Sequence, residues 1–308
     1  MWIMQTIEST KFIANIDEIG VRLVHLIDRA SGYDYVWDNA LHKSDKPVTF
    51  PGILFPAIGR SNQDSYVYHG KTYSMPQHGF ASDFVFTIVA KSHDKVIMTL
   101  SADEKTKKMY PFTFELTVLA TIDDNGLHWK FEVKNCGKEV MPFSLGNHPG
   151  FNVPINHQGE FTDYTLSFDP APAKLSYYKI IKKPYPFRRG DLATVPNYSQ
   201  GKLHLNYAMF AEGLVIIENK GIDSVTLASS QTQRKIQLNI KDFRYLCLWT
   251  KENTKHSLLC LEPFEGLPDI YGNPVDWSHK EANNFLAPEK TKVFRFDVLA
   301  SSLNSFSK

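Results

Sequence analysis

Residues 112–134 read FTFELTVLATI-DDNG-LHWKFEVK, which is two arms around a short polar turn. Apolar and polar side chains alternate along both arms, so that Phe114 and Leu116 point to one side while Glu115 points to the other. The Asn125-Gly126 pair supplies residues that tolerate the positive φ angles of a tight hairpin turn. The stretch therefore predicts an antiparallel hairpin with one buried face.

Further strands are predicted on both sides of this hairpin, where short runs rich in Val, Ile, Leu, Phe and Thr recur. The runs cover residues 21–27, 85–89, 96–100, 164–168, 214–218, 224–228, 235–240, 245–250, 257–261 and 292–298. Turn-rich pieces separate them, including 219–221 and a long Pro- and Tyr-rich stretch at 170–201, and residues 278–285 predict one short helix. Many strands without intervening helices predict an all-β protein, a large antiparallel β-sandwich.

The length of the chain is compatible with one large domain. A chain of 308 residues can bury a sizeable core, and an all-β sandwich of this length is commonly a single domain. We therefore assign residues 1–300 to one domain and residues 301–308 to a frayed C-terminal tail.

The charge balance argues against a polyanionic partner. The 34 basic and 33 acidic residues are spread along the chain and leave a net charge of +1, so no broad field attracts nucleic acid or an anionic membrane. The N-terminus lacks a basic segment followed by a long apolar run, and no later stretch is apolar for long enough to cross a bilayer. We expect a cytoplasmic protein with a neutral partner.

The three cysteines, Cys136, Cys247 and Cys260, are too few and too widely spaced for a disulfide framework or a CxxC zinc site. Cys247 and Cys260 lie inside apolar runs, where a thiol usually behaves as a small hydrophobic group. We interpret them as reduced core residues. A catalytic thiol is the weaker alternative, because no histidine lies in the same local motif.

Four segments depart from the strand pattern by placing ionisable side chains among Gly, Pro and aromatic residues: FPGILFPAIGR (50–60), MPQHGFASD (75–83), MPFSLGNHPGF (141–151) and SLLCLEPFEGLPD (257–269). Arg60 in the first can present a rigid fork of donors to ligand oxygens, or can be a surface arginine paired with a carboxylate. His78 in the second is held between Pro and Gly, as a functional ring or as a structural one bonded to a backbone carbonyl.

The third and fourth segments carry the candidate acid and base. His148 lies between two glycines and directly before a proline, in an uncommon tight turn, and an imidazole is the commonest acid or base in catalysis. Glu262 follows an apolar strand, where burial can raise the pKa of a carboxyl group towards that of a useful base. Glu265 and Asp269 are rivals, although both follow turn residues and have the pattern of solvated loop charges.

Histidines and carboxylates also bind metals, so a metal site is an alternative. His78, His148 and Glu262 lie far apart in sequence, and no HxH, HxxxH or HExxH grouping joins them. The sequence therefore predicts no metal, although a fold can assemble a site from distant residues.

Together the four segments resemble the signatures of the aldose 1-epimerase superfamily, in particular its LacX-like bacterial branch of galactose-mutarotase-related proteins. The matching motifs are FPAIGR (55–60), PQHGFA (76–81), GNHPGF (146–151) and LEPFEG (261–266), in the family's order across most of the chain. The resemblance implies a galactose mutarotase-like supersandwich with a site in a groove on one sheet, no cofactor, and a sugar as substrate.

The resemblance also implies roles for individual residues. Glu262 takes the proton of the anomeric hydroxyl and His148 protonates the ring oxygen, so the pyranose opens, rotates about the C1–C2 bond and closes as the other anomer. His78 and Arg60 hold the C1 and ring oxygens as donors. An aromatic ring lies against the apolar face of the sugar; the candidates are Trp249 and Phe80.

Two departures from the family pattern concern the substrate. The motif HGFAR has Ser82 in place of its arginine, which favours an unphosphorylated aldose over a hexose 6-phosphate. An aspartate that relatives carry before strand 214–218 is Gly213 here, so either Glu212 replaces it or recognition of the sugar hydroxyls differs. We expect an aldose 1-epimerase; the alternatives are a noncatalytic carbohydrate-binding protein, a hexose-6-phosphate 1-epimerase and a metal-dependent sandwich enzyme of the cupin kind.

Overall fold

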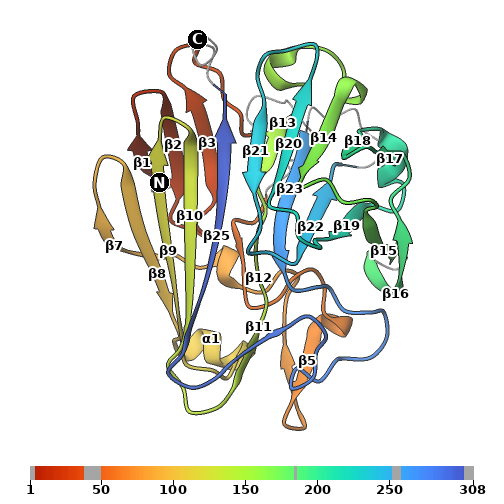
Figure 1. Cartoon of the computed structure of the whole chain (residues 1–308). Helices are drawn as coiled ribbons and strands as arrows, with labels where there is room; N and C mark the ends of the chain where they lie inside the picture. Colours follow the sequence, from red (N-terminus) through yellow and green to blue (C-terminus); the bar gives the residue numbers. More distant parts are fainter. Residues whose placement is uncertain (1–3, 38–49, 184–185, 252–257, 302–308) are drawn as a thin grey trace.

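Antiparallel β-strands make up most of the fold in the computed structural model, which describes residues 4–37, 50–183, 186–251 and 258–301 (Figure 1). Over these ranges the single α-helix is α1 (Glu104–Met109), and no helix within them is long and apolar enough to span a membrane. The prediction of a large antiparallel all-β fold is confirmed.

The largest sheet has ten strands, and the order across it mixes segments from both halves of the sequence. From one edge to the other it contains β17 (Tyr198–Ser199), β18 (Lys202–His204), β14 (Tyr164–Asp169), β20 (Ser224–Ser229), β21 (Ile236–Asn239), β25 (Thr291–Ala300), β10 (Gly126–Asn135), β9 (Phe114–Asp123), β8 (Lys95–Ser101) and β7 (Thr87–Lys91). The long strand β25 joins the two halves, because it pairs with both β10 and β21.

A second sheet has eight strands, and it positions the site. Its order is β16 (Phe187–Thr194), β15 (Ser176–Ile181), β19 (Leu214–Glu218), β22 (Tyr245–Trp249), β23 (Leu258–Glu265), β12 (Leu145–Asn147) and β4 (Ile53–Leu54), with β13 (Gly150–Asn152) also paired to β23. Three small sheets complete the fold: β1 (Met4–Glu8) with β2 (Phe12–Asp17) and β3 (Leu23–Asp28), β5 (Ser65–Tyr68) with β6 (Lys71–Ser74), and β11 (Met141–Phe143) with β24 (Asn284–Leu286).

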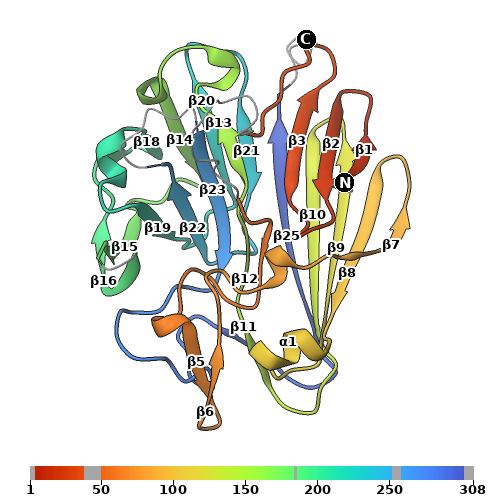
Figure 2. The ribbon, with the colours of Figure 1, turned by 180° about the vertical axis from the view of Figure 1, so that it is seen from behind.

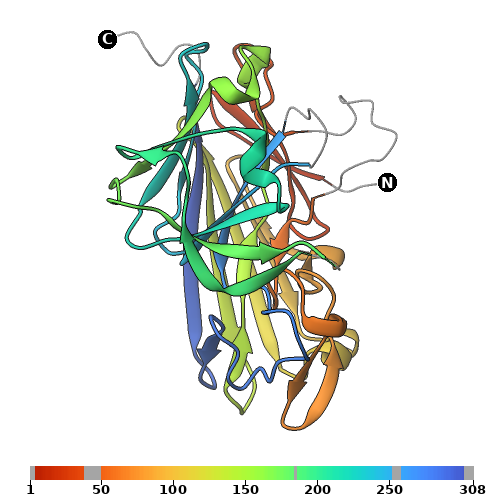
Figure 3. The ribbon, with the colours of Figure 1, turned by 90° about the vertical axis from the view of Figure 1, so that its right-hand side faces the viewer.

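The sheets form layers around a large apolar core, with two smaller apolar clusters beside it. The β1–β3 sheet lies over the β7–β10 half of the large sheet, and β22 and β23 lie over the half that contains β14, β20 and β21 (Figures 1 and 2). Figure 3 shows β25 running along much of the length of the molecule, and it shows the β5–β6 hairpin at the lower end of the molecule. Buried side chains from both halves belong to the same core cluster.

The hairpin that decides the fold is present as β9 and β10, and its alternation is as predicted: Phe114 and Leu116 are buried while Glu115 is exposed. The turn differs in detail, since Asp123 pairs with Gly126 and, of the Asn125-Gly126 pair, the glycine alone has a positive φ, 145°. Gly126 is needed because β25 passes close by, so that a Cβ atom there would lie 2.3 Å from a backbone oxygen.

Most predicted strands are confirmed within a few residues of their ends, but two expectations were wrong. The Pro- and Tyr-rich stretch 170–201 is not only turns: it contains β15 and β16, which pair with a register shift, and β17, which pairs with β18. Residues 278–285 form turns and the start of β24 instead of a helix. The helix α1 lies elsewhere and begins at a capping box formed by Asp103 and Thr106. Strands β1 and β2 precede the first predicted strand, and of the expected tail at 301–308 all but the first residue lies outside the described residues.

Candidate active site

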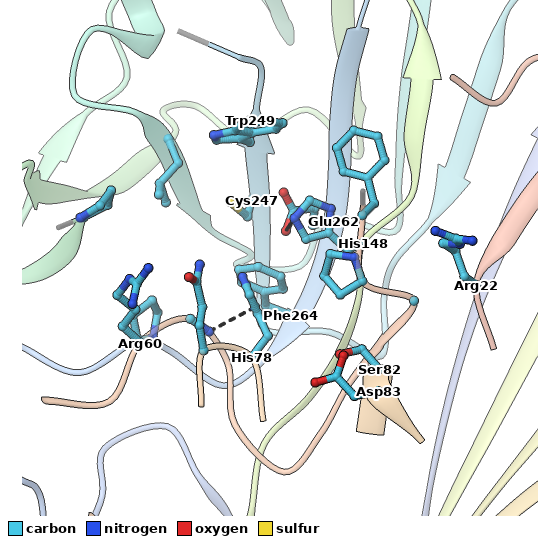
Figure 4. Close-up of a pocket in the computed structure, with 18 of the residues that line it drawn as sticks. Arg22, Arg60, His78, Ser82, Asp83, His148, Cys247, Trp249, Glu262 and Phe264 are labelled. Atoms are coloured by element: carbon cyan, nitrogen blue, oxygen red, sulfur yellow. Dashed lines mark hydrogen bonds and ion pairs between the residues drawn. The ribbon is translucent and has the colours of Figure 1, made fainter. Parts of the chain in front are cut away.

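A cleft of about 640 Å³ opens on the eight-stranded sheet and brings the four sequence segments together (Figure 4). The five site residues expected from the sequence all line it: Arg60, His78, His148, Trp249 and Glu262. The remaining lining residues are Asp17, Ile19, Arg22, Phe50, Pro51, Gly52, Gly59, Gln77, Ser82, Asp83, Pro186, Leu214, Cys247, Phe264 and Pro268.

Strand β23 positions Glu262 on the floor of the cleft by simple alternation. Leu259 and Leu261 point into the core between the sheets, whereas Cys260 and Glu262 point to the opposite face. Both faces of β23 are covered, so Glu262 is only 2% exposed although it lines the cleft. The expected common face of residues 258, 260 and 262 is therefore present.

His148 faces Glu262 from the neighbouring connection between β12 and β13. Its backbone N–H donates to the carbonyl of Gly52 at 3.2 Å, which fixes the turn. Gly146 precedes it where a Cβ atom would collide with the Ile58 side chain at 2.8 Å, so the strand approaches its neighbours closely. The Nε2 atom of His148 lies 3.3 Å from Oε2 of Glu262. The two sequence-distant groups thus form one pair.

Burial controls the protonation of this pair. It raises the pKa of Glu262 well above its usual range, and burial followed by the neighbouring His78 lowers the pKa of His148 to about 3. Both changes favour the uncharged forms, a carboxylic acid beside a neutral imidazole. This form holds the same single proton as a carboxylate beside an imidazolium, so moving that proton across the 3.3 Å contact interconverts the two. The pair can therefore give and take a proton without changing its total charge.

His78 is held in one tautomer by the backbone. It has a positive φ of 66°, its N–H donates to the carbonyl of Gly59 at 2.7 Å, and its Nδ1 accepts the N–H of Gly59 at 3.2 Å. A neutral ring whose Nδ1 accepts carries its proton on Nε2. Burial and then the charge of Arg60 lower the pKa of His78 to about 4, which keeps it neutral. The alternative of a ring bonded to a backbone carbonyl is wrong, because the partner is an N–H.

Arg60 and Trp249 lie at the wall of the cleft. Arg60 forms a long ion pair, 3.7 Å, with the exposed Asp64, as its interpretation as a surface arginine predicted, and it also lines the cleft. The Trp249 ring lies edge-on to His148, with centroids 6.4 Å apart. Phe80 was wrongly considered as a sugar platform: it is 1% exposed and packs in the core against Phe55.

The rival carboxylates Glu265 and Asp269 are not solvated loop charges, as the sequence suggested. Both are buried, at 3% and 2% exposed, and neither lines the cleft. Glu265 is paired with Arg244 at 2.8 Å, and Asp269 is paired with the buried Lys280. Each therefore has a cation that Glu262 lacks among the described residues.

Several lining residues were missed by sequence reasoning. Gln77 and Asp83 stood inside a quoted segment, whereas Arg22, in the β2–β3 connection, and its ion-pair partner Asp17, 2.9 Å away at the end of β2, carry no motif. Glu212, considered as a replacement for the family's aspartate, lines a different cavity of about 430 Å³ beside β15 and β16. Glu212 therefore does not line the cleft that contains Glu262 and His148.

Thiols lie next to the candidate acid–base pair, which the sequence did not predict. Cys247 and Cys260 are free and buried, as expected for reduced core residues, while Cys136 is partly exposed. The ligand atoms of His148, Cys260 and Glu262 all lie within 4.8 Å of one another. The fold thus assembles a set of metal-ligating atoms that no local spacing revealed, and His78 is not part of it.

The fold and the cleft define the class of the protein, an isomerase enzyme with a galactose mutarotase-like fold. The chain belongs to the aldose 1-epimerase family, whose model matches residues 4–274. The chromosomal protein LacX of Lactococcus lactis subsp. lactis is 26% identical over 299 residues, which is 92% of each chain.

Two solved structures show how far the similarity extends. A galactose mutarotase-like protein from Lactobacillus casei ATCC 334 superposes with a TM-score of 0.90 at 39% identity, covering 97% of this chain and 100% of that one. A galactose mutarotase related enzyme from Lactobacillus acidophilus gives 0.88 at 26% identity, covering 99% and 100%. The predicted superfamily and its LacX-like branch are confirmed.

Proposed function

We propose that the protein is an aldose 1-epimerase that interconverts the α and β anomers of a free aldose, with Glu262 as base and His148 as acid. The observation that carries the proposal is the contact of 3.3 Å between Nε2 of His148 and the carboxyl group of Glu262 on the floor of an open cleft. Opening a neutral sugar ring requires one proton to be removed and another to be delivered at the same carbon centre. A pair that shares one proton meets this requirement.

The proton balance of the reaction closes within the pair. In the reactive form Glu262 is the carboxylate and His148 the imidazolium. Glu262 removes the proton of the anomeric hydroxyl while His148 gives its proton to the ring oxygen, so the C1–O5 bond breaks and a free aldehyde forms. The aldehyde rotates about C1–C2, and the reverse transfers close the ring as the other anomer. The pair ends with the one proton it began with.

The surrounding residues are suited to holding a sugar in the required orientation. His78 directs an Nε2–H donor at the cleft, because its Nδ1 is occupied by the N–H of Gly59. Arg60 adds charged donors for ring and C1 oxygens. Trp249 offers an aromatic face to the apolar side of a pyranose. Placing the reacting oxygens between acid and base is itself a large part of such catalysis.

A hexose-6-phosphate 1-epimerase is the second candidate, and one observation favours it. Arg22 lines the same cleft, so a guanidinium is present although residue 82 is serine. We prefer the unphosphorylated substrate because Arg22 is already paired with Asp17 at 2.9 Å and because Asp83 also lines the cleft and would repel a phosphate.

Exchange NMR between the anomeric signals of an aldose tests the proposal. We expect the protein to accelerate exchange and Glu262→Gln to lower the rate by about 10²- to 10⁴-fold, since one proton transfer is lost. Glu265→Gln is a matched control, the same substitution three residues further along β23 and outside the cleft, and it retains the activity. Unchanged exchange in Glu262→Gln overturns the assignment of the base.

The same assay separates the remaining alternatives. Saturable sugar binding without acceleration of exchange, measured on the unmodified protein, favours a noncatalytic carbohydrate-binding protein. A panel of free aldoses and hexose 6-phosphates identifies the substrate, and we expect galactose or another free aldose to be converted faster than any phosphate. A preference for a phosphate that is lost in Arg22→Gln supports the second candidate instead.

A further inference from the structure

The floor of the cleft contains thiol groups, which the proposed proton transfer does not use, beside the imidazole and the carboxyl group that it does use. We call His148, Cys247, Cys260 and Glu262 the cleft-floor cluster. Three of its members come from β22 and β23: Cys247 lies opposite Glu262 in the strand register, and Cys260 precedes Glu262 by two residues on the same face. Imidazole nitrogen, thiol sulfur and carboxyl oxygen are the ligands that zinc takes in proteins.

The distances within the cluster are close to those of a coordination sphere. The ligand atoms of His148, Cys260 and Glu262 lie within 4.8 Å of one another. Zinc bonds of about 2.0–2.3 Å place tetrahedral ligands roughly 3.3–3.8 Å apart, so an approach of about 1 Å by side-chain rotation completes the site. Cys247 lies opposite Glu262 in the strand register and lines the cleft, but its thiol is not one of the three ligand atoms that lie within 4.8 Å of one another.

Burial and access also agree with a metal site. Cys260 is fully buried beside Trp37 and Leu258, and Glu262 is 2% exposed, so a bound ion would be shielded from water. His148, Glu262 and Cys247 line the cleft, and it provides a path for an ion to enter. No Lys or Arg side chain pairs with Glu262 among the described residues, and a dication would balance the charge of its carboxylate form.

We propose that the cleft-floor cluster binds a thiophilic divalent cation such as Zn²⁺ and that the bound ion inhibits the enzyme. A set containing sulfur and nitrogen selects Zn²⁺ over the hard ions Mg²⁺ and Ca²⁺, which prefer oxygen ligands. The ion would occupy the lone pairs of His148 and Glu262 that the reaction needs, and binding would release two protons to solvent, the one that His148 and Glu262 share and the thiol proton of Cys260. The inhibitory effect rests on the proposed function, whereas binding of the ion does not.

Cobalt(II) tests the site by a readout that is independent of activity. Titration of the full-length protein with Co²⁺ is expected to give one equivalent of a near-ultraviolet thiolate-to-cobalt charge-transfer absorption, and added Zn²⁺ removes it. Cys260→Ser weakens binding by at least the roughly 10- to 100-fold typical of lost outer-shell partners, since here a direct ligand is lost. Cys136→Ser, which changes a partly exposed thiol that is not part of the cluster, retains the absorption.

Two outcomes overturn the site: no charge-transfer absorption in the unmodified protein, or an absorption of equal strength and affinity in Cys260→Ser. Thermal unfolding shows whether Cys260→Ser is folded, and Cys260→Ala provides a second variant if it is not. Because the cobalt signal needs no substrate, failure of the site and failure of the proposed function can be told apart.

Exchange NMR with Zn²⁺ tests the inhibition. We expect micromolar to millimolar Zn²⁺ to abolish anomeric exchange, a chelator to restore it, and Cys260→Ser to need at least about tenfold more Zn²⁺ for the same effect. Mg²⁺ at the same concentration leaves exchange unchanged. Cobalt binding at the cluster combined with zinc-insensitive exchange overturns the inhibitory role.

Discussion

The cleft floor around Glu262 and the neighbouring region around Asp269 contain carboxylates only seven residues apart, both 2% exposed. Asp269 is paired with the buried Lys280 and accepts the backbone N–H of Asn62 at 2.9 Å. Glu262 faces a neutral imidazole and a thiol. Equal burial thus has opposite consequences: with a cation the carboxylate stabilises the fold, and without one it is left with a raised pKa, ready to exchange a proton.

The paired region nevertheless serves the cleft indirectly. The backbone N–H of Asp269 donates to the carbonyl of Arg60 at 3.1 Å, and its side chain holds the next turn through Asn62. Pro268 packs on Gly59 so closely that a Cβ atom there would lie 2.5 Å from the proline ring. Asp269 therefore helps to fix the loop that carries Arg60 without lining the cleft.

The largest expected change in stability follows from breaking the paired carboxylate. Asp269→Ala should lower the free energy of unfolding by about 3–5 kcal/mol, because it leaves the charge of Lys280 buried without a partner. Urea denaturation followed by fluorescence measures the loss. The double variant Asp269→Leu with Lys280→Met recovers most of it, since no buried charge remains. A loss below about 1 kcal/mol in Asp269→Ala would mean that the pair contributes little.

A smaller loss of stability is expected when either of the two glutamates of β23 is replaced by glutamine, and the two losses can be compared directly. Glu265→Gln weakens contacts with Arg244 and Lys292, 2.8 and 3.6 Å away, and should lower the free energy of unfolding by about 1.5–3 kcal/mol. Glu262→Gln replaces an uncharged carboxyl by an amide of the same shape and should cost less than about 1 kcal/mol. Equal losses of unfolding free energy in the two variants would show that Glu262 stabilises the fold as much as Glu265 does. That result would contradict the contrast between the paired and the unpaired carboxylate.

The sequence predicted five of the residues that line the cleft. It did not predict why the carboxylates of Glu262 and Asp269 differ in their partners. Alternation along 258–262 was enough to place Glu262 on the face opposite the core, and the turn around His148 was visible from its glycines and proline. The pairing of Asp269 could not be seen, because Lys280 lies eleven residues further along an irregular segment whose end, from residue 278, was expected to form a helix. A pattern indicates which side a residue faces; the partner it meets depends on tertiary contacts.

The same limit explains the other errors. Strands β15 and β16 are rich in Tyr and charged residues and pair with a register shift, so the period-two signal is weak there. The closeness of Cys260 to His148 arises from the pairing of β13 with β23, which joins segments more than one hundred residues apart. Long-range pairing of this kind has no local signature.

The smallest expected effect concerns a partly exposed site. There the cation that pairs with the carboxylates is a histidine, which gains and loses its proton with pH. His128 lies between Asp297 and Asp123, with Nδ1 2.9 Å from the first and Nε2 3.1 Å from the second. The hydrogen bond to Asp297 is the main cause that raises the pKa of His128 to about 9, above its usual value near 6.5. The folded protein therefore binds this proton more tightly than the unfolded chain does.

The contribution of His128 is complete below about pH 6.5 and is lost as the pH rises to about 9, because over that range the unfolded chain has released the proton while the folded protein retains it. Unfolding by urea between pH 6 and pH 9.5 should show this loss, and His128→Gln should remove it, so that the two proteins converge at the alkaline end. A difference between them that stays constant with pH would mean that His128 stabilises the β9–β10 hairpin by packing alone. Pairing with a cation would then stabilise the fold at the buried Asp269 but not at the more exposed carboxylates beside His128. Burial would be the condition that decides whether such a pair contributes to stability.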